Sequence, residues 1–151
     1  MTIIKELPIG KFETIFEQVQ LLLTELREEP SQSADQYKDK ILADWKRRPD
    51  QHVVFAAYDD DIIVGIITLS ESFAIYAEGY HGIINELYVT PDYRSGGIGQ
   101  LLLERAKKYA KERSWLRIEV TAPAGEKWER TVAFYLREGF QSAGPKLRYF
   151  T

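Results

Sequence analysis

The spacing of apolar residues changes early in the chain from alternate positions to every third or fourth position. Residues 1–7 alternate apolar and polar side chains, which predicts a first strand. From residue 12 to residue 26 the spacing becomes helical, and this amphipathic helix is expected to end before Pro30. Its apolar face consists of Phe12, Ile15, Phe16, Val19, Leu22, Leu23 and Leu26.

A second helix is predicted between residues 33 and 49. Ser33 and Gln36 have the spacing of a capping box, in which two side chains bond the free N–H groups of a first helical turn. Pro49 marks the end of this helix, because proline interrupts helical hydrogen bonding. The residues expected to face inward are Tyr37, Ile41, Leu42 and Trp45.

Two stretches rich in Val, Ile and Phe follow, at residues 52–58 and 62–73. The acidic residues 59–61 join them, so the two stretches are predicted to form a hairpin. A loop at residues 76–82 then returns the chain into a fourth strand, at residues 83–90.

The second half of the chain mixes strands with helices. A helix is predicted at residues 97–113, a strand at 115–121 and a helix at 129–138 that ends at a glycine cap. Two short strands, around Gln141 and at residues 147–150, close the chain. The inner face of the first of these helices is expected to hold Ile98, Leu101, Leu102, Ala106 and Tyr109.

This order of elements predicts the α/β class. A strand–helix–strand unit requires a parallel pair, whereas the hairpins before it require antiparallel pairs. The consistent solution is a mixed, mostly antiparallel sheet of about seven strands with about four helices on its two faces. A length of 151 residues fits one domain, so residues 1–151 are expected to form a single domain.

Composition excludes several classes of protein. With 44% apolar and 28% charged residues, the chain is neither disordered nor collagen-like. It has no cysteine, which rules out a disulfide framework and a Cys-ligated metal site, and we expect no metal. No apolar run approaches the roughly 20 residues of a membrane-spanning helix, and residues 1–13 carry no secretory signal. We therefore expect a cytoplasmic protein with no membrane partner, and the net charge of −3 disfavours nucleic acid.

The turn at residues 94–99 is the most informative stretch for function. Its three glycines allow tight folding and bring backbone N–H groups close to a ligand. The helix that follows begins with free N–H donors and the positive end of its dipole, which suit a phosphate or pyrophosphate. Basic side chains then predict a local positive patch, formed by Arg105, Lys107, Lys108, Lys111 and Arg113.

Other interpretations of this turn fit the residues less well. A P-loop is excluded, because Gln100 and Leu101 follow Gly99 in place of Lys and Ser or Thr. A dinucleotide-binding turn requires a third glycine where Leu102 stands, although Glu119 has the spacing of a ribose ligand. The glycines could also serve only to make a tight strand-to-helix turn.

Three motifs in this part of the chain identify a family. They are Asn85-Glu86-Leu87-Tyr88-Val89-Thr90-Pro91, then Arg94-x-x-Gly97-x-Gly99, then Phe134-Tyr135 followed by Gly139-Phe140. Together they resemble the GNAT superfamily of acetyl-CoA-dependent N-acetyltransferases. The likeness is strong over residues 83–140, and the order of elements fits the whole chain.

The resemblance implies a site for acetyl-CoA as cosubstrate. In that family the pyrophosphate binds N–H groups of the turn, here residues 95–100. The pantetheine arm pairs with strand backbone, here residues 87–89, in a gap before the strand at 115–121. The basic residues beyond the turn could meet the 3′-phosphate. The residues expected to bind the cofactor are Leu87, Tyr88, Val89, Arg94, Ser95, Gly96, Gly97, Ile98, Gly99 and Gln100.

The resemblance also implies direct acetyl transfer to an amine. At pH 7 an amine with a pKa of ~10.4 is mostly protonated, so a base must remove a proton. Glu86 is the candidate base, acting through a water, and Tyr135 is the candidate acid for the departing thiolate. A backbone N–H near Leu87 or Tyr88 would stabilise the oxyanion. Glu86 could instead be a satisfied strand carboxylate, and Tyr135 an aromatic packed beside Phe140.

The chain departs from the family pattern at Trp128, where an Asn that helps hold the pantetheine is usual. Glu129, Arg130 and Thr131 are the neighbouring residues that could substitute for it. The departure leaves open a second function, a non-catalytic acyl-CoA-binding or sensing module. A generic anion- or nucleotide-binding domain is a third.

The acceptor is expected to be the amine of a small molecule or a peptide. In the family its site lies at the first two helices and at the loop before the fourth strand. The residues offered there are Tyr37, Trp45, Tyr76, Glu78, Tyr80 and His81, and such acids and aromatics would suit a cationic amine. The two closing strands leave a homodimer open as an option.

Overall fold

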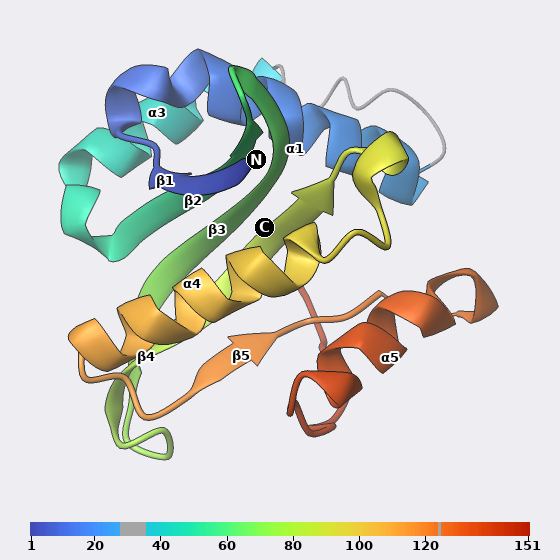
Figure 1. Cartoon of the computed structure of the whole chain (residues 1–151). Coiled ribbons are helices and arrows are strands. Elements are labelled where there is room, and N and C mark those ends of the chain that lie inside the picture. The colour runs from blue at the N-terminus through green and yellow to red at the C-terminus, as the bar shows by residue number, and fades with distance from the viewer. Residues whose placement is uncertain (28–35, 124) are drawn as a thin grey trace. The chain divides into compact units, whose positions relative to one another are not determined.

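The computed structural model of the chain describes residues 1–27, 36–123 and 125–151 (Figure 1). By their internal contacts these residues form two compact units, Met1–Glu119 and Val120–Thr151. The expectation of one domain over the whole chain stays a prediction. Among the described residues, no helix has the length and apolar character needed to cross a membrane.

A five-stranded mixed sheet, in which the order of the strands follows the chain, forms the centre of the fold. Its strands are β1 (Thr2–Glu6), β2 (His52–Asp59), β3 (Ile62–Ala74), β4 (Gly79–Val89) and β5 (Ile118–Val120). The first four strands pair antiparallel, whereas the arrows of β4 and β5 point the same way (Figure 1). The helices are α1 (Phe12–Arg27), α3 (Lys38–Arg47), α4 (Ile98–Glu112) and α5 (Glu129–Arg137). The predicted α/β class is confirmed.

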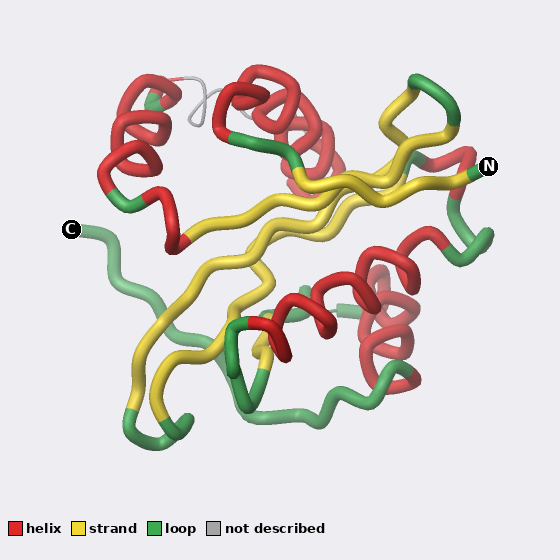
Figure 2. The backbone as a smooth tube through the Cα atoms, turned by 60° about the vertical axis from the view of Figure 1, so that its left-hand side comes forward, coloured by secondary structure: helices red, strands yellow, loops and turns green. Residues whose placement is uncertain are grey.

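Helices cover both faces of the sheet in the first unit. Figure 2 shows α1 and α3 on one face and α4 on the other. On the α1 face a core forms around Ile15, Ile66 and Tyr88, with Trp45 packed against it. On the α4 face Gly65 lies so close to Ile98 and Leu102 that a side chain there would touch both.

The predicted hairpin forms, and its turn is tighter than expected. Asp59 pairs with Ile62, so only Asp60 and Asp61 lie between the strands. Asp60 adopts a φ of 54°, the left-handed conformation that tight hairpin turns require.

The second helix differs from the prediction. Ser33, half of the predicted capping box, lies outside the described residues. Tyr37 and Ile41 were expected to face inward, but they are 52% and 40% exposed, and α3 has no fully buried residue. Trp45 of this helix packs with its ring edge-on to His52 at 4.7 Å and to Phe12 at 6.3 Å.

The inner face of α4 is rotated relative to the prediction. The buried residues of this helix are Ile98, Leu102, Leu103, Ala106 and Ala110. Leu101, expected inside, is 45% exposed, and Tyr109 is only partly buried. Three consecutive leucines leave the phase of the helix undetermined by the sequence. The contact with the sheet decides which face is buried, and that face includes every fourth residue from Ile98.

The end of the chain forms fewer strands than expected, which is why the sheet has five strands where about seven were predicted. Residues 140–151 lie in no helix or strand, and Leu147, Tyr149 and Phe150 are more than 80% exposed. Gly144, at a φ of 107°, and the proline after it interrupt this segment. The strand predicted at 115–121 is also shorter, because the N–H of Trp115 bonds the last turn of α4.

Candidate active site

A β-bulge in β4 lies next to the candidate base. Thr68 pairs with Glu86 and Leu69 pairs with Ile84, so Asn85 is an extra residue in β4. The Asn85 side-chain amide donates to the Ser70 hydroxyl at 3.0 Å. Such bulges re-aim the residues beyond them, and they are frequent beside active sites.

Beyond the bulge, alternate residues of β4 direct their backbone groups to opposite edges. The Thr90 N–H donates to the Val64 carbonyl of β3 at 2.9 Å, so the even-numbered residues here face β3. By the same alternation Leu87 and Val89 direct their N–H and C=O groups away from β3. Before the bulge the parity is reversed, because the Gly82 N–H donates to the Arg117 carbonyl at 3.1 Å on the other side.

Strand β4, whose outer edge carries the backbone groups of Leu87 and Val89, is longer than its neighbour β5. β4 continues from Gly82 to Val89, whereas β5 ends at Val120, soon after Arg117. The carboxyl end of β4 therefore extends beyond the residues of β5 that could pair with it. Its backbone groups there suit an extended ligand, such as the pantetheine arm that the resemblance implies.

Glu86 is held by a buried hydroxyl on the neighbouring strand. The Thr68 Oγ1 donates to the Glu86 carboxylate, and it accepts the Glu86 N–H at 3.1 Å. Thr68 is 1% exposed. Burial raises the pKa of the Glu86 carboxyl, and the hydrogen bond from Thr68 opposes this only in part. A carboxyl with a raised pKa is a better proton acceptor at neutral pH than an ordinary glutamate.

The glycine turn leaves the N-terminus of α4 open. Ser95 and Gly97 adopt φ angles of 67° and 87°, and α4 begins directly after Gly97, which has no side chain to cap it. The Leu101 N–H closes the first turn of the helix by bonding the Gly97 carbonyl at 3.0 Å. The N–H groups of residues 98–100 precede it and have no acceptor inside the helix. No acidic side chain lies in this first turn, so it presents positive potential.

Arg94, the first residue of the turn, has defined partners. Its Nε donates to the Val89 carbonyl at 2.9 Å, and an Nη2 hydrogen bonds Glu25 of α1 at 2.6 Å. The guanidinium also lies over the Tyr88 ring, 5.6 Å from its centre. Sequence reasoning missed Glu25 as a partner, because it lies 69 residues away from Arg94.

The predicted positive patch on α4 is partly neutralised. Arg113 forms an ion pair with Glu71 of β3 at 3.0 Å, and Arg105 lies over the Phe55 ring and 3.8 Å from Glu112. Lys107 is 3.5 Å from Glu104 on the same helix. Arg113 therefore belongs to the structural support of the sheet rather than to an anion site.

Tyr135 lies in the second unit, on α5, and is 6% exposed. Its ring is edge-on to Phe134 and to Phe140, at 5.3 Å from each. The predicted glycine cap is present: Gly139 has a φ of 99°, and the Phe140 N–H bonds the Tyr135 carbonyl at 3.0 Å. Burial raises the pKa of the Tyr135 phenol to about 12.

Trp128 is the residue from which α5 starts, and it provides no side-chain cap for that helix. Its N–H bonds the Gly125 carbonyl at 3.0 Å. Beside it, a pocket of about 490 Å³ is lined by Glu126, Glu129 and Val132, among others. Of the three residues that could substitute for the missing Asn, Glu129 is the one that lines this pocket.

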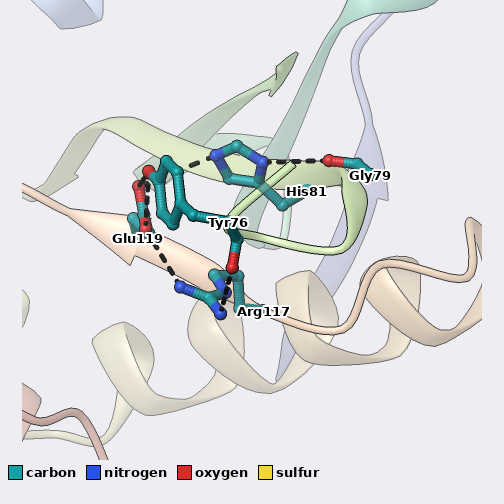
Figure 3. Close-up of polar contacts among 5 residues, drawn as sticks. All are labelled: Tyr76, Gly79, His81, Arg117 and Glu119. Carbon is teal, nitrogen blue, oxygen red and sulfur yellow. Dashed lines mark hydrogen bonds and ion pairs between the residues drawn. The ribbon is translucent and has the colours of Figure 1, made fainter. Parts of the chain in front are cut away.

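A polar cluster near the β3–β4 loop contains three residues that the sequence analysis singled out: Tyr76 and His81 for the acceptor site, and Glu119 as a ribose ligand. His81 is 2% exposed, and its ring lies between the Gly79 carbonyl, at 3.4 Å, and Glu119, at 3.6 Å (Figure 3). The Tyr76 hydroxyl is 3.2 Å from both oxygens of Glu119, and Arg117 is 3.8 Å from one of them. Glu119 thus already has protein partners, which does not favour the ribose ligand considered above.

Comparison with known proteins identifies the family. A model of the acetyltransferase (GNAT) family matches residues 17–140. The chain belongs to the GNAT acetyltransferase family. The match spans β4, the turn at residues 94–99 and α4.

Individual relatives agree with this assignment. An uncharacterized N-acetyltransferase from Archaeoglobus fulgidus is 37% identical over 71 residues, which are 46% of this chain and 48% of the relative. The match thus spans about half the length of that curated relative.

Solved structures share the fold at low sequence identity. A predicted acetyltransferase from Clostridium acetobutylicum, crystallised with acetyl-CoA, has a TM-score of 0.81 at 19% identity, over 99% of this chain and 96% of that one. A GCN5-related N-acetyltransferase from Ralstonia eutropha JMP134 has a TM-score of 0.82 at 18% identity, over 99% of both chains. Within the described part of this GNAT chain, no group of three His, Asp or Glu residues could hold a metal ion.

Proposed function

We propose that this GNAT protein is an N-acetyltransferase that transfers an acetyl group from acetyl-CoA directly to an amine. The observation that carries the proposal is the open N-terminus of α4, with its N–H groups at residues 98–100 and no acidic side chain. Among the described residues, apart from its two chain neighbours, a Cβ added at Gly97 would meet no atom within 4 Å, which leaves room there for a ligand. These features fit the diphosphate of acetyl-CoA.

The carboxyl end of β4 supports the next part of the proposal. Acetyl-CoA supplies an acetyl group activated as a thioester. Leu87 directs its N–H and C=O to the edge of β4 that faces away from β3, where they can pair with an extended amide. The Val89 carbonyl is already bonded to Arg94, so its N–H is the group left for a ligand. Of the two residues considered for the oxyanion, the alternation favours Leu87, because Tyr88 directs its N–H towards β3.

Glu86 is proposed as the base that accepts the proton of the amine, through a water. An amine with a pKa of ~10.4 must give up this proton at a cost of ~4.6 kcal/mol at pH 7. The raised pKa of Glu86 and its position beside the bulge support this role. The hydrogen bond from Thr68 leaves lone pairs of the carboxylate for a water.

Tyr135 is proposed as the acid that protonates the CoA thiolate. With its pKa raised to about 12, the phenol keeps its proton throughout the physiological range. Transfer of that proton to a thiolate with a thiol pKa of ~8.5 is uphill by roughly 5 kcal/mol, so a proton from solvent must follow. Single-turnover assays of Tyr135→Phe test this role, and Tyr109→Phe is the matched control. Equal acetyl-transfer rates in the two variants would refute it.

A non-catalytic acyl-CoA-binding module is the second candidate function. Two observations favour it: Trp128 stands where the family usually has Asn, and Tyr135 is a weaker acid than an ordinary tyrosine. Such a protein would bind acetyl-CoA through the same open turn but would not release free CoA when amines are added.

Ligand binding followed by an amine panel tests the proposed function. Binding to the native state alone raises the Tm, so acetyl-CoA and CoA should raise it more than NAD or ATP. Release of free thiol in the presence of acetyl-CoA and an amine then separates the enzyme from the binding module. A shift with NAD or ATP but not with CoA would refute both functions.

A further inference from the structure

The Arg94 side chain connects three parts of the first unit. It bonds the last carbonyl of β4, at Val89, and a carboxylate of α1, at Glu25, and it packs over the ring of Tyr88. Arg94 and Glu25 are 40% and 31% exposed, so their contact at 2.6 Å is only partly screened by water. The phosphate-binding turn begins at Arg94, so the position of this side chain affects how the turn leaves β4.

We propose that Glu25 is a positioning residue for acetyl-CoA binding, which holds the Arg94 guanidinium against the Val89 carbonyl. The inference rests on the proposed function, because the ligand it concerns is acetyl-CoA. A guanidinium carries five N–H donors in a rigid fork, so two of its three nitrogens can be anchored while its remaining N–H donors are available to a ligand. Glu25 thereby fixes both the end of β4 and the first residue of the turn.

Removing the charge of Glu25 should change the affinity for CoA in the direction opposite to that expected from simple electrostatics. Glu25 is an acidic residue near a site for a diphosphate. If it acted only through its charge, Glu25→Gln would strengthen the binding of CoA, because it removes a repulsion. If it acts by holding Arg94, the same change releases the guanidinium and weakens the binding.

Calorimetric titration of CoA into the full chain tests the inference. Glu25→Gln should weaken binding about two- to fivefold, the range for one partly exposed ion pair. Glu17→Gln, on an exposed position of the same helix, should leave the affinity unchanged. Asp92→Asn, which removes an exposed acid just before the turn, should leave it unchanged or slightly strengthen it. Binding as tight as or tighter than wild type in Glu25→Gln overturns the inference.

A double mutant separates positioning from a general effect on stability. In an Arg94→Gln background, Glu25→Gln should cause no further loss of affinity, because the side chain that it positions is already gone. A further loss of the same factor contradicts the inference. So does a lower Tm in Glu25→Gln with an unchanged affinity for CoA. If the wild type itself binds no CoA, the proposed function fails first, and this outcome is distinct from a normal wild type with an unaffected Glu25→Gln variant.

Discussion

At its N-terminal end α4 leaves its first N–H groups without helix partners, whereas at its C-terminal end the chain folds back to satisfy the last carbonyls. There the Trp115 N–H bonds the Ala110 carbonyl at 2.8 Å, and the Ser114 N–H bonds the Lys111 carbonyl at 3.2 Å. Ser114 takes the left-handed conformation, with a φ of 60°, which this type of helix end requires.

Side chains complete the closed end, whereas the N-cap residue of the open end, Gly97, provides no side-chain cap. Glu71 of β3 accepts hydrogen bonds from Arg113 at 3.0 Å and from the Trp115 indole at 2.7 Å. The same indole fills the space above Gly82, where an added Cβ would lie 2.4 Å from it. At the open end Gly97 has no side chain at all, and the two residues before it, Ser95 and Gly96, are exposed.

The difference indicates what each end contributes. A helix end whose backbone groups are satisfied contributes to stability and has little left for a ligand. An end whose donors point to solvent contributes less to stability but can bind an anion. Mutations at the closed end should therefore change mainly the free energy of unfolding, and mutations at the open end should change mainly the affinity for the ligand.

The largest effect is expected at the closed end. Trp115→Ala should lower the free energy of unfolding by about 3–5 kcal/mol, since it empties a buried site and removes a hydrogen bond to Glu71. Urea denaturation measures the change. Leu116→Ala, at the neighbouring position that is 72% exposed, should cost less than about 0.5 kcal/mol. Similar losses at the two positions would show that Trp115 does not support this end.

The next largest effect is expected on kcat/KM at Glu86, on the strand that leads into the open end. Glu86→Gln should lower kcat/KM about 100-fold at pH 7, the lower range for loss of a general base. In the wild type kcat/KM should rise with pH as Glu86 loses its proton, which gives the pH–rate profile an acidic limb. Because burial raises the pKa of Glu86, this limb should lie at a higher pH than it would for an ordinary glutamate. The variant should lack the limb. The two enzymes should converge as the pH approaches the pKa of the amine, where no base is needed.

Thr68→Val provides an internal check on this assignment. The hydrogen bond from Thr68 lowers the pKa of Glu86. Its loss in Thr68→Val should raise that pKa further, so the acidic limb of the variant should lie at a higher pH than that of the wild type. The pH–rate profile of this variant gives the direction. An identical limb in wild type, Glu86→Gln and Thr68→Val would remove Glu86 from the mechanism.

Local patterns predicted the features that depend on local sequence. The hairpin at Asp60, the glycine turn before α4 and the cap at Gly139 all follow from residues within a few positions of one another. The assignment to the GNAT family also rested on short motifs, and it is confirmed.

What the sequence missed depends on contacts between distant residues. Glu86 meets Thr68 across 18 positions, and Trp115 meets Glu71 across 44. No spacing rule indicates such partners, because pairing between strands decides them. The bulge at Asn85 was missed for the same reason, since it exists only relative to β3. The two closing strands were predicted from local sequence, which does not reveal whether a partner strand is available.

A charge placed at the open end should weaken binding without a large loss of stability. Gly97→Asp should lower the affinity for CoA at least about tenfold, because a carboxylate would stand where the diphosphate is expected. Gly97→Asn is the matched control, since Asn has the same shape and also tolerates the left-handed φ of 87°. Titration calorimetry compares the two variants. Equal affinities would place the diphosphate elsewhere.

The smallest effect is expected at Ser114, and it separates the two ends most cleanly. A serine in the left-handed conformation is strained, whereas glycine adopts this conformation freely. Ser114→Gly should therefore raise the free energy of unfolding by about 0.5–1 kcal/mol, measured by urea denaturation. The affinity for CoA should not change, because the bonds at this end are made by backbone groups that the substitution keeps. A change in affinity with no gain in stability would mean that the two ends of α4 are not independent.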